Sequence, residues 1–236
     1  MKQRILVINP NSTQTVTEHM SAALEGFRFR DGPEIVCETL RSGPPGIETQ
    51  AHVDGATRNL LDYFDKRREK RRADAVVIGC FSDPGLVALR ETLGRPVYGM
   101  GACSYLTAAA LGERFGVISV VSGAIARHKR YIHSLGLDHR LAGDIAVDMS
   151  VVELSKEGVV WKRMAATGQA LRDRHGADVV IMGCAGMSRY RNRLEDYLGI
   201  AVIDPVQAAV GMAMGALLAR RSTTGDARAA GGKGKR

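Results

Sequence analysis

Two stretches of the sequence decide the fold: residues 72–80, RADAVVIGC, and residues 176–184, GADVVIMGC. Each contains Ala-Asp, then four consecutive apolar residues, then Gly-Cys. An apolar run of this length is typical of a strand that is buried on both faces of a parallel sheet. Because the two stretches lie 104 residues apart, the sequence predicts that the chain contains the same structural unit twice.

The repeat continues on either side of these strands. Residues 93–97, LGRPV, match residues 198–202, LGIAV, at an offset of 105, and residues 5–8 have a weaker counterpart in 117–120. The predicted strands are residues 5–8, 35–39, 75–78, 97–98, 116–121, 145–149, 179–182 and 201–203. Helical patterns such as those at 13–24, 54–68 and 159–173 lie between them. This alternation predicts an α/β fold with two pseudo-symmetric α/β halves, each with a mostly parallel sheet of about four strands.

The composition is that of an ordinary globular protein, with 45% apolar and 25% charged residues. Aromatic residues make up only 5%, which argues against a base-stacking surface, so no nucleic-acid partner is expected. The net charge of +8 is concentrated in residues 220–236, and a second basic run lies at 66–72. We interpret these as a disordered tail and a solvated helix end; the alternative is a weak polyanion-binding patch.

No membrane partner is expected either. Residues 4–8 are too short for a signal core and are followed at once by the turn signal at 9–12. The longest apolar stretch, residues 206–219, suits a buried helix better than a membrane span. A cytoplasmic location is therefore expected, with the four cysteines as free thiols. They form no zinc-type spacing, so no metal is expected.

Two of the cysteines occupy the equivalent end of the repeated strand. Ligands of open α/β sheets bind at the carboxyl ends of strands, so Cys80 and Cys184 lie where chemistry is expected. Asp83 and Pro84 favour a helix start after Cys80, with Asp83 as N-cap. A thiol beside a helix N-terminus is expected to have a lowered pKa.

Paired thiols on facing halves suit a reaction that inverts a stereocentre. One thiol removes a proton from a carbon next to a carbonyl, and the other returns a proton to the opposite face. Donors for the resulting enolate oxygen are expected from the turns at 9–13 and 121–123. Cys37 and Cys103 lack such a relationship and are assigned to the core. The six histidines follow no pattern, so most are assigned surface or structural roles.

Four motifs stand out along the chain: INPNS at 8–12, GPPGIE at 43–48, CFSDPGL at 80–86 and GCAGM at 183–187. Together they resemble the hydantoin/allantoin racemases of the aspartate/glutamate racemase superfamily, within a similarity that runs from about residue 4 to residue 219. The resemblance implies a cofactor-independent isomerase with its active site between the halves and with Cys80 and Cys184 as catalytic residues. The implied substrate is a cyclic ureide, either a 5-substituted hydantoin or allantoin. The substrate contacts that it implies are Asn11, Ser12, Pro45, Ile47, Phe81, Val121, Ser122, Ala185 and Gly186.

The resemblance also implies a division of the chain and an assembly. Residues 1–100 plus 205–220 would form the first half, with the C-terminal helix packing back on it, and residues 101–204 the second half, followed by the tail at 221–236. The protein is expected to form a homo-oligomer. One departure from the family pattern is the loop at Val121 and Ser122, where consecutive threonines are more usual.

Alternative functions remain open at this point. A related arylmalonate decarboxylase needs a thiol on one side only, whereas both are present here. An aspartate or glutamate racemase needs extra contacts for a second carboxylate, which the sequence does not single out. A maleate isomerase also uses two cysteines. A non-enzymatic polyanion-binding module rests on the basic tail alone.

Overall fold

The computed structural model describes residues 2–66 and 73–230 and contains two four-stranded parallel sheets, with strand orders β2-β1-β3-β4 and β6-β5-β7-β8. The first consists of β1 (Arg4–Asn9), β2 (Glu34–Thr39), β3 (Ala75–Ile78) and β4 (Val97–Gly99). The second consists of β5 (Phe115–Ser119), β6 (Leu141–Ala146), β7 (Val179–Met182) and β8 (Ala201–Ile203). The identical strand order confirms the prediction of two α/β halves with parallel sheets.

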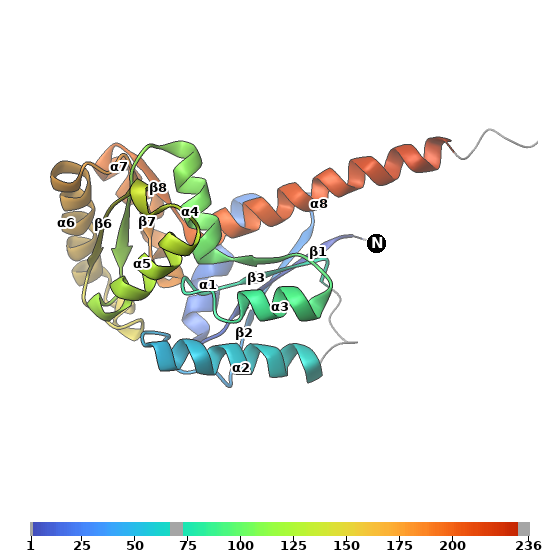
Figure 1. Ribbon diagram of the computed structural model, residues 1–236, viewed down its shortest axis with the longest axis horizontal. Coiled ribbons are helices and arrows are strands. Elements are labelled where there is room, and N and C mark those ends of the chain that lie inside the picture. Colours follow the sequence, from blue (N-terminus) through green and yellow to red (C-terminus); the bar gives the residue numbers. More distant parts are fainter. Residues whose placement is uncertain (1, 67–72, 231–236) are drawn as a thin grey trace, which may run out of the picture.

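Helices connect the strands in both halves (Figure 1). The α-helices are α1 (Gln14–Ala23), α2 (Gln50–Lys66), α3 (Leu86–Leu93), α4 (Met100–Leu111), α5 (Ile125–Ser134), α6 (Glu157–His175), α7 (Arg191–Leu198) and α8 (Pro205–Ala230). Short 3₁₀ turns are η1 (Glu25–Phe27), η2 (Ser122–Ala124), η3 (Asp138–Arg140), η4 (Val152–Ser155) and η5 (Ala185–Tyr190). Both central strands of the repeat, β3 and β7, are buried along their whole length, as their apolar sequences predict.

The repeated Ala-Asp before each central strand has the same structural role in both halves. The Asp74 carboxylate accepts the backbone N–H of Arg4 at the start of β1, at 2.7 Å. The Asp178 carboxylate likewise accepts the N–H of Arg114 beside β5, at 3.0 Å. Each aspartate therefore fixes where the central strand begins relative to its neighbour, which also aligns the carboxyl ends of the strands.

The helix that follows the last strand of each sheet packs on the other sheet. Helix α4, which follows β4, contacts β7 and β8 of the second sheet, whereas α8, which follows β8, contacts β1, β3 and β4 of the first. The two helices also pack against each other. In Figure 1, α8 runs from this junction outward along the first sheet. This exchange of helices brings the two sheets together.

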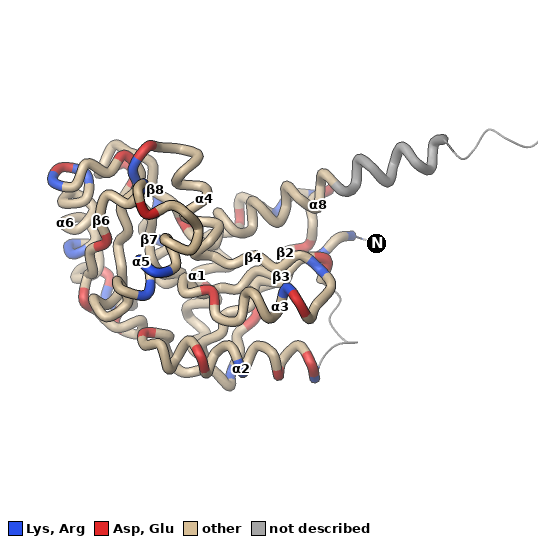
Figure 2. Tube along the Cα trace, in the orientation of Figure 1, with Lys and Arg blue, Asp and Glu red and all other residues tan. Residues whose placement is uncertain are grey.

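The main difference from the sequence prediction is in the strand at 145–149. Strand β6 is Leu141–Ala146, earlier in the chain, because the residues after Ala146 form a loop. Helix α8 continues to Ala230, so it carries helical backbone into the segment predicted as a disordered tail. Residues 231–236, and most of the basic run at 66–72, lie outside the described residues. In Figure 2, charges of both signs are dispersed over the outer helices. Among the described residues, none of the helices combines the length and apolarity needed to span a bilayer.

Candidate active site

A cavity of about 40 Å³ lies between the halves, where loops that follow β1, β3, β5 and β7 meet. It is lined by both repeat cysteines, Cys80 from the first half and Cys184 from the second. Both side chains are half-buried. The repeat in the sequence therefore becomes a pair of thiols that face one enclosed space.

Each thiol has a backbone N–H beside it, two residues further along the chain. The N–H of Gly186 lies 3.3 Å from Cys184 Sγ, and the N–H of Ser82 is hydrogen-bonded to Cys80. An N–H donor favours a thiolate over a thiol, so it lowers the pKa of the sulfur. The two donors are therefore placed alike in the two halves.

The expectation that the thiols have lowered pKa values is wrong for this structure. Burial raises the pKa of Cys80 to about 12 and that of Cys184 to about 11. The nearby N–H donors lower both values, but the loss of solvation outweighs them. Nearby negative charge raises them further, from Asp83 at Cys80 and from Glu48 at Cys184. Both thiols are therefore protonated at neutral pH and of similar basicity.

The glycine before each cysteine allows a close approach of two strands. A Cβ on Gly183 would lie 2.8 Å from the carbonyl oxygen of Ile118 in β5, and one on Gly79 would lie 3.0 Å from that of Ile8 in β1. The same glycines donate their N–H groups to these carbonyls, at 2.8 and 2.7 Å. Neither has a positive φ. These glycines therefore set the strand spacing directly behind the thiols.

The structure brings most of the predicted contact residues to the cavity. Besides the cysteines, the predicted residues that line it are Asn11, Ile47, Phe81, Val121 and Ala185. The other predicted contacts, Ser12, Pro45, Ser122 and Gly186, do not line it. Ser12 donates its N–H to Pro44, and Ser122 donates its N–H to Asp148, so both hold the shape of loops that carry lining residues.

Sequence reasoning missed several polar residues of the cavity wall: Glu48, Ser82, Arg127 and His128. Arg127 on α5 donates to Ser82 Oγ at 3.2 Å and to the carbonyl oxygen of Glu48 at 3.3 Å. It therefore joins two loops of the first half to a helix of the second. Glu48 and Ser82 lie inside motifs that the sequence had already singled out, so their motifs were a usable signal. Arg127 and His128 lie in no recognised motif.

Asp83 does not cap the helix that follows Cys80. The N-cap of α3 is Gly85, and Asp83 has a positive φ of 45°. Its carboxylate instead accepts the N–H groups of Gly101 and Ala102 in the first turn of α4, at 2.9 and 2.8 Å. Tyr131 on α5 donates to the same carboxylate at 2.7 Å. Asp83 therefore ties the Cys80 loop to α4 and to the second half. Burial raises the pKa of Asp83 to about 6.

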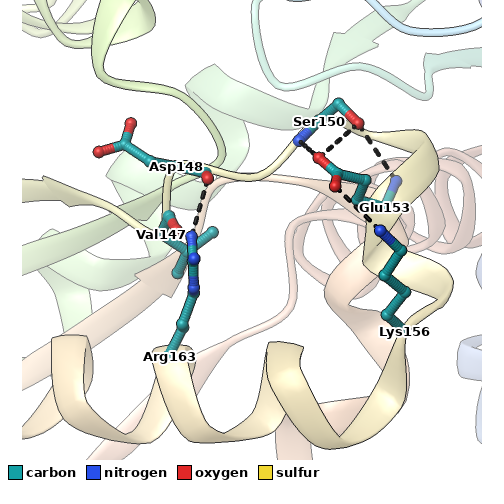
Figure 3. A network of polar contacts seen from close by, with 6 residues as sticks. All are labelled: Val147, Asp148, Ser150, Glu153, Lys156 and Arg163. Carbon is teal, nitrogen blue, oxygen red and sulfur yellow. Dashed lines mark hydrogen bonds and ion pairs between the residues drawn. The ribbon is translucent and has the colours of Figure 1, made fainter.

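The loop that follows β6 contributes Val151 to the cavity and is held by a polar network (Figure 3). Arg163 donates to the carbonyl oxygens of Val147 and Asp148, at 2.7 and 2.8 Å. Glu153 accepts from the N–H and the hydroxyl of Ser150 and pairs with Lys156. These contacts lower the pKa of Glu153 to about 2, so the network stays charged over the physiological range. The backbone on either side of Val151 is thereby fixed.

A larger, open cleft of about 810 Å³ lies elsewhere, between β2 and α2. It contains Cys37 but neither repeat cysteine. Within the described part of the chain, no group of three or more His, Cys, Asp and Glu side chains is placed to hold a metal. The small cavity between the halves is therefore the better candidate, because it is less open to solvent and has two equivalent ionisable groups.

Both the sequence and the fold are similar to those of known proteins. Residues 5–213 match the family model described as Asp/Glu/Hydantoin racemase. The hydantoin racemase of Paenarthrobacter aurescens is 31% identical over 211 residues, covering 87% of each chain. The hydantoin racemase of Pseudomonas sp. strain NS671 is 30% identical, over 88% of this chain and 83% of the other. The structure of the allantoin racemase from Klebsiella pneumoniae has a TM-score of 0.85 and 31% identity, over 92% of this chain and 88% of that one.

Proposed function

This chain belongs to the Asp/Glu/Hydantoin racemase family, and we propose that it inverts the C5 stereocentre of a hydantoin-type cyclic ureide, a 5-substituted hydantoin or allantoin. The chain is an isomerase, and Cys80 and Cys184 exchange the C5 proton. The observation that carries the mechanism is that two thiols at equivalent strand ends of the repeated halves line one cavity.

The reaction needs one thiolate and one thiol. The thiolate removes the C5 proton, and the electron pair of the C–H bond moves onto the adjacent carbonyl oxygen to give an enolate. The thiol on the opposite face then gives its proton to C5, and the two sulfurs have exchanged their protonation states. The enzyme is then ready to convert the product enantiomer back. Because one proton is removed and one is returned, the reaction consumes no net proton and no electron.

The pKa values of about 12 and about 11 suit this exchange. A base of high pKa accepts the proton of a weak carbon acid more readily, although a smaller fraction is ionised. Two sulfurs of nearly equal pKa serve both enantiomers with similar efficiency. Backbone N–H groups beside each sulfur and the Arg127 guanidinium near Cys80 support the ionised form.

Heavy-water exchange tests the proposal. Single-enantiomer L-5-benzylhydantoin or (S)-allantoin should lose optical rotation and take up deuterium at the stereocentre, without consumption of any cofactor. Cys80→Ser and Cys184→Ser should each abolish racemisation. Cys37→Ser and Cys103→Ser are matched controls that should leave it intact, because neither sulfur lines the cavity. Full activity in either of the first two variants contradicts the two-thiol mechanism.

The alternative activities give different outcomes in the same assay. Loss of carbon dioxide from an arylmalonate without racemisation of a ureide would identify a decarboxylase. Racemisation of aspartate or glutamate, or isomerisation of maleate, would identify the other relatives considered above.

Three further predictions belong to this proposal. We infer that residues 1–100 plus 205–220 and residues 101–204 are the two halves, which is supported by the packing of α8 on β1, β3 and β4. We also infer that the enzyme is a homo-oligomer and acts in the cytoplasm. Sedimentation analysis and cell fractionation test these two inferences.

A further inference from the structure

A second polar cluster is buried beside the two thiols. It consists of Ser119 at the end of β5, Asp144 on β6 and His128 on α5. Ser119 is fully buried, and the side chains of His128 and Asp144 are 5% and 0% exposed. The mechanism proposed above uses none of these residues. Buried polar groups are costly unless they are paired, so the arrangement of this cluster calls for an explanation.

The hydrogen bonds of the cluster define which ring nitrogen of His128 carries a hydrogen. The Ser119 hydroxyl donates to one oxygen of the Asp144 carboxylate, which uses its only hydrogen. His128 Nδ1 lies 2.9 Å from the other carboxylate oxygen and 3.1 Å from Ser119 Oγ. Both neighbours of Nδ1 are thus acceptors, so Nδ1 must be the donor. In the neutral imidazole, Nε2 is then a hydrogen-bond acceptor.

The side chain of His128 forms part of the cavity wall. Its ring lines the cavity with Cys80 and Cys184, and packs edge-on against Phe81 with ring centroids 5.2 Å apart. Among the described residues, Nδ1 is the ring nitrogen of His128 that is hydrogen-bonded, and no bond to Nε2 is formed. The contact with Asp144 holds the ring in one orientation and one tautomer, as carboxylates do for the histidines that they contact in metal sites.

The side chains of the cavity wall offer few other acceptors. Oε1 of Glu48 accepts the N–H of Val151, which leaves Oε2 of that carboxylate, and Oδ1 of Asn11 is engaged by Asn9 and Thr13. The Arg127 side chain supplies only donors. A cyclic ureide carries ring N–H groups, and each of these needs an acceptor when the ring is buried.

We propose that His128 Nε2 accepts a hydrogen bond from a ring N–H of the substrate and thereby selects cyclic ureides over rings that lack this donor. Asp144 and Ser119 are positioning residues that fix the tautomer of His128. This inference rests on the proposed racemisation of a cyclic ureide and adds the residue that recognises it. A site built to accept an N–H discriminates against an analogue without it, because a buried acceptor is then left unpaired.

N-methylated substrates test the inference. We compare racemisation of a 5-substituted hydantoin with that of its N1-methyl and N3-methyl derivatives. The wild type should prefer the parent to one of the derivatives by about tenfold or more in kcat/KM. His128→Asn places an amide nitrogen near the Nδ1 position, so it keeps a donor to Asp144 and removes Nε2. It should lose about tenfold on the parent compound and almost nothing on that derivative.

Asp144→Asn separates hydrogen bonding from steric fit. An amide at this position can donate to Nδ1 and so favour the tautomer in which Nε2 carries the hydrogen. The ring keeps its size, but its acceptor becomes a donor. The parent compound should therefore lose its advantage although the methyl group still meets the same ring. If His128→Asn does not fold, His128→Gln replaces it, since its amide oxygen can reach the Nε2 position and should preserve part of the preference.

The outcomes separate this inference from the proposed function. If the wild type racemises the parent hydantoin and the folded His128→Asn and Asp144→Asn variants retain its full preference for the unmethylated ring, the assignment of His128 is overturned while the racemase function stands. If the wild type exchanges no ureide proton in heavy water, the proposed function and this inference both fall. Loss of the preference in both variants, with unchanged melting temperatures, supports the assignment.

Discussion

Oε1 of Glu48 accepts the backbone N–H of Val151 at 2.8 Å, across a separation of 103 residues. Both residues line the cavity, one from the loop before α2 and the other from the loop after β6. This hydrogen bond therefore closes the wall between the two halves directly. The same carboxylate raises the pKa of Cys184, so Glu48 has both a structural and an electrostatic effect on the site.

Substitution of Glu48 should separate these two effects. Glu48→Gln keeps an oxygen that can accept from Val151 but removes the charge, so the pKa of Cys184 should fall while KM stays close to that of the wild type. Glu48→Ala removes both the acceptor oxygen and the charge. KM should then rise about tenfold, because the loop before α2 is no longer hydrogen-bonded to the loop after β6. Steady-state racemisation and the pH dependence of thiol alkylation measure the two quantities. An equal rise in KM for both variants would show that the hydrogen bond is not what Glu48 contributes.

The raised thiol pKa values predict a steep pH dependence of alkylation. At pH 8, about one Cys80 in ten thousand and about one Cys184 in a thousand should be thiolate. Iodoacetamide should modify both cysteines slowly at neutral pH, and both rates should increase about tenfold per pH unit up to pH 10 or so. Mass spectrometry of the separate peptides follows each site. A rate that reaches its plateau near pH 7 at either cysteine would contradict the raised values.

The repeat made the fold and the thiols predictable. Four apolar residues followed by Gly-Cys encode a buried strand and a thiol at its end, and this information is local. The pKa values were not predictable in the same way. The sequence shows that N–H donors follow each cysteine, but not how completely the surrounding loops bury the sulfur, and burial has the larger effect.

Contacts between elements that are distant in the chain were also beyond the sequence. Asp83 precedes a helix start and therefore suggested a local cap, but its carboxylate reaches α4, eighteen residues on. His128 and Asp144 are likewise joined only because β5 and β6 are neighbours and α5 packs beside them. Such contacts depend on how elements are placed relative to each other, which spacing in the chain does not encode.

Replacement of Gly183 should displace Cys184. In Gly183→Ala the new methyl group would lie 2.8 Å from the Ile118 carbonyl oxygen, so β7 must move away from β5. The free energy of unfolding should fall by about 1–3 kcal/mol, and racemisation should fall with it. Gly123→Ala is the matched control, because a Cβ there meets no atom within 4 Å. Urea unfolding monitored by circular dichroism compares the two; equal stability would contradict the close packing behind the thiol.

Tyr131→Phe should destabilise the protein in a pH-dependent manner. Tyr131 donates to the Asp83 carboxylate at 2.7 Å, and this bond lowers the pKa of Asp83, which burial has raised to about 6. Between the unfolded value near 3.8 and about 6, the folded carboxyl keeps a proton that the unfolded one has lost, so stability decreases as pH rises through this range. In the variant the folded pKa is higher still, so the decrease continues further toward neutral pH.

The difference between the variant and the wild type should therefore depend on the charge of Asp83. Above the folded pKa, the variant loses a hydrogen bond to a charged group, worth about 1.5–3 kcal/mol, whereas near pH 5 it loses a bond to a neutral carboxyl, worth about 1 kcal/mol. Tyr105→Phe is the control, because the Tyr105 hydroxyl is buried and has no hydrogen-bond partner among the described residues. Removing an unpaired hydroxyl should cost nothing or stabilise the protein slightly. Urea unfolding near pH 5, and again at a pH above the folded pKa of Asp83, measures the effect. A Tyr131→Phe loss that is the same at both would mean that Asp83 does not change its charge between them.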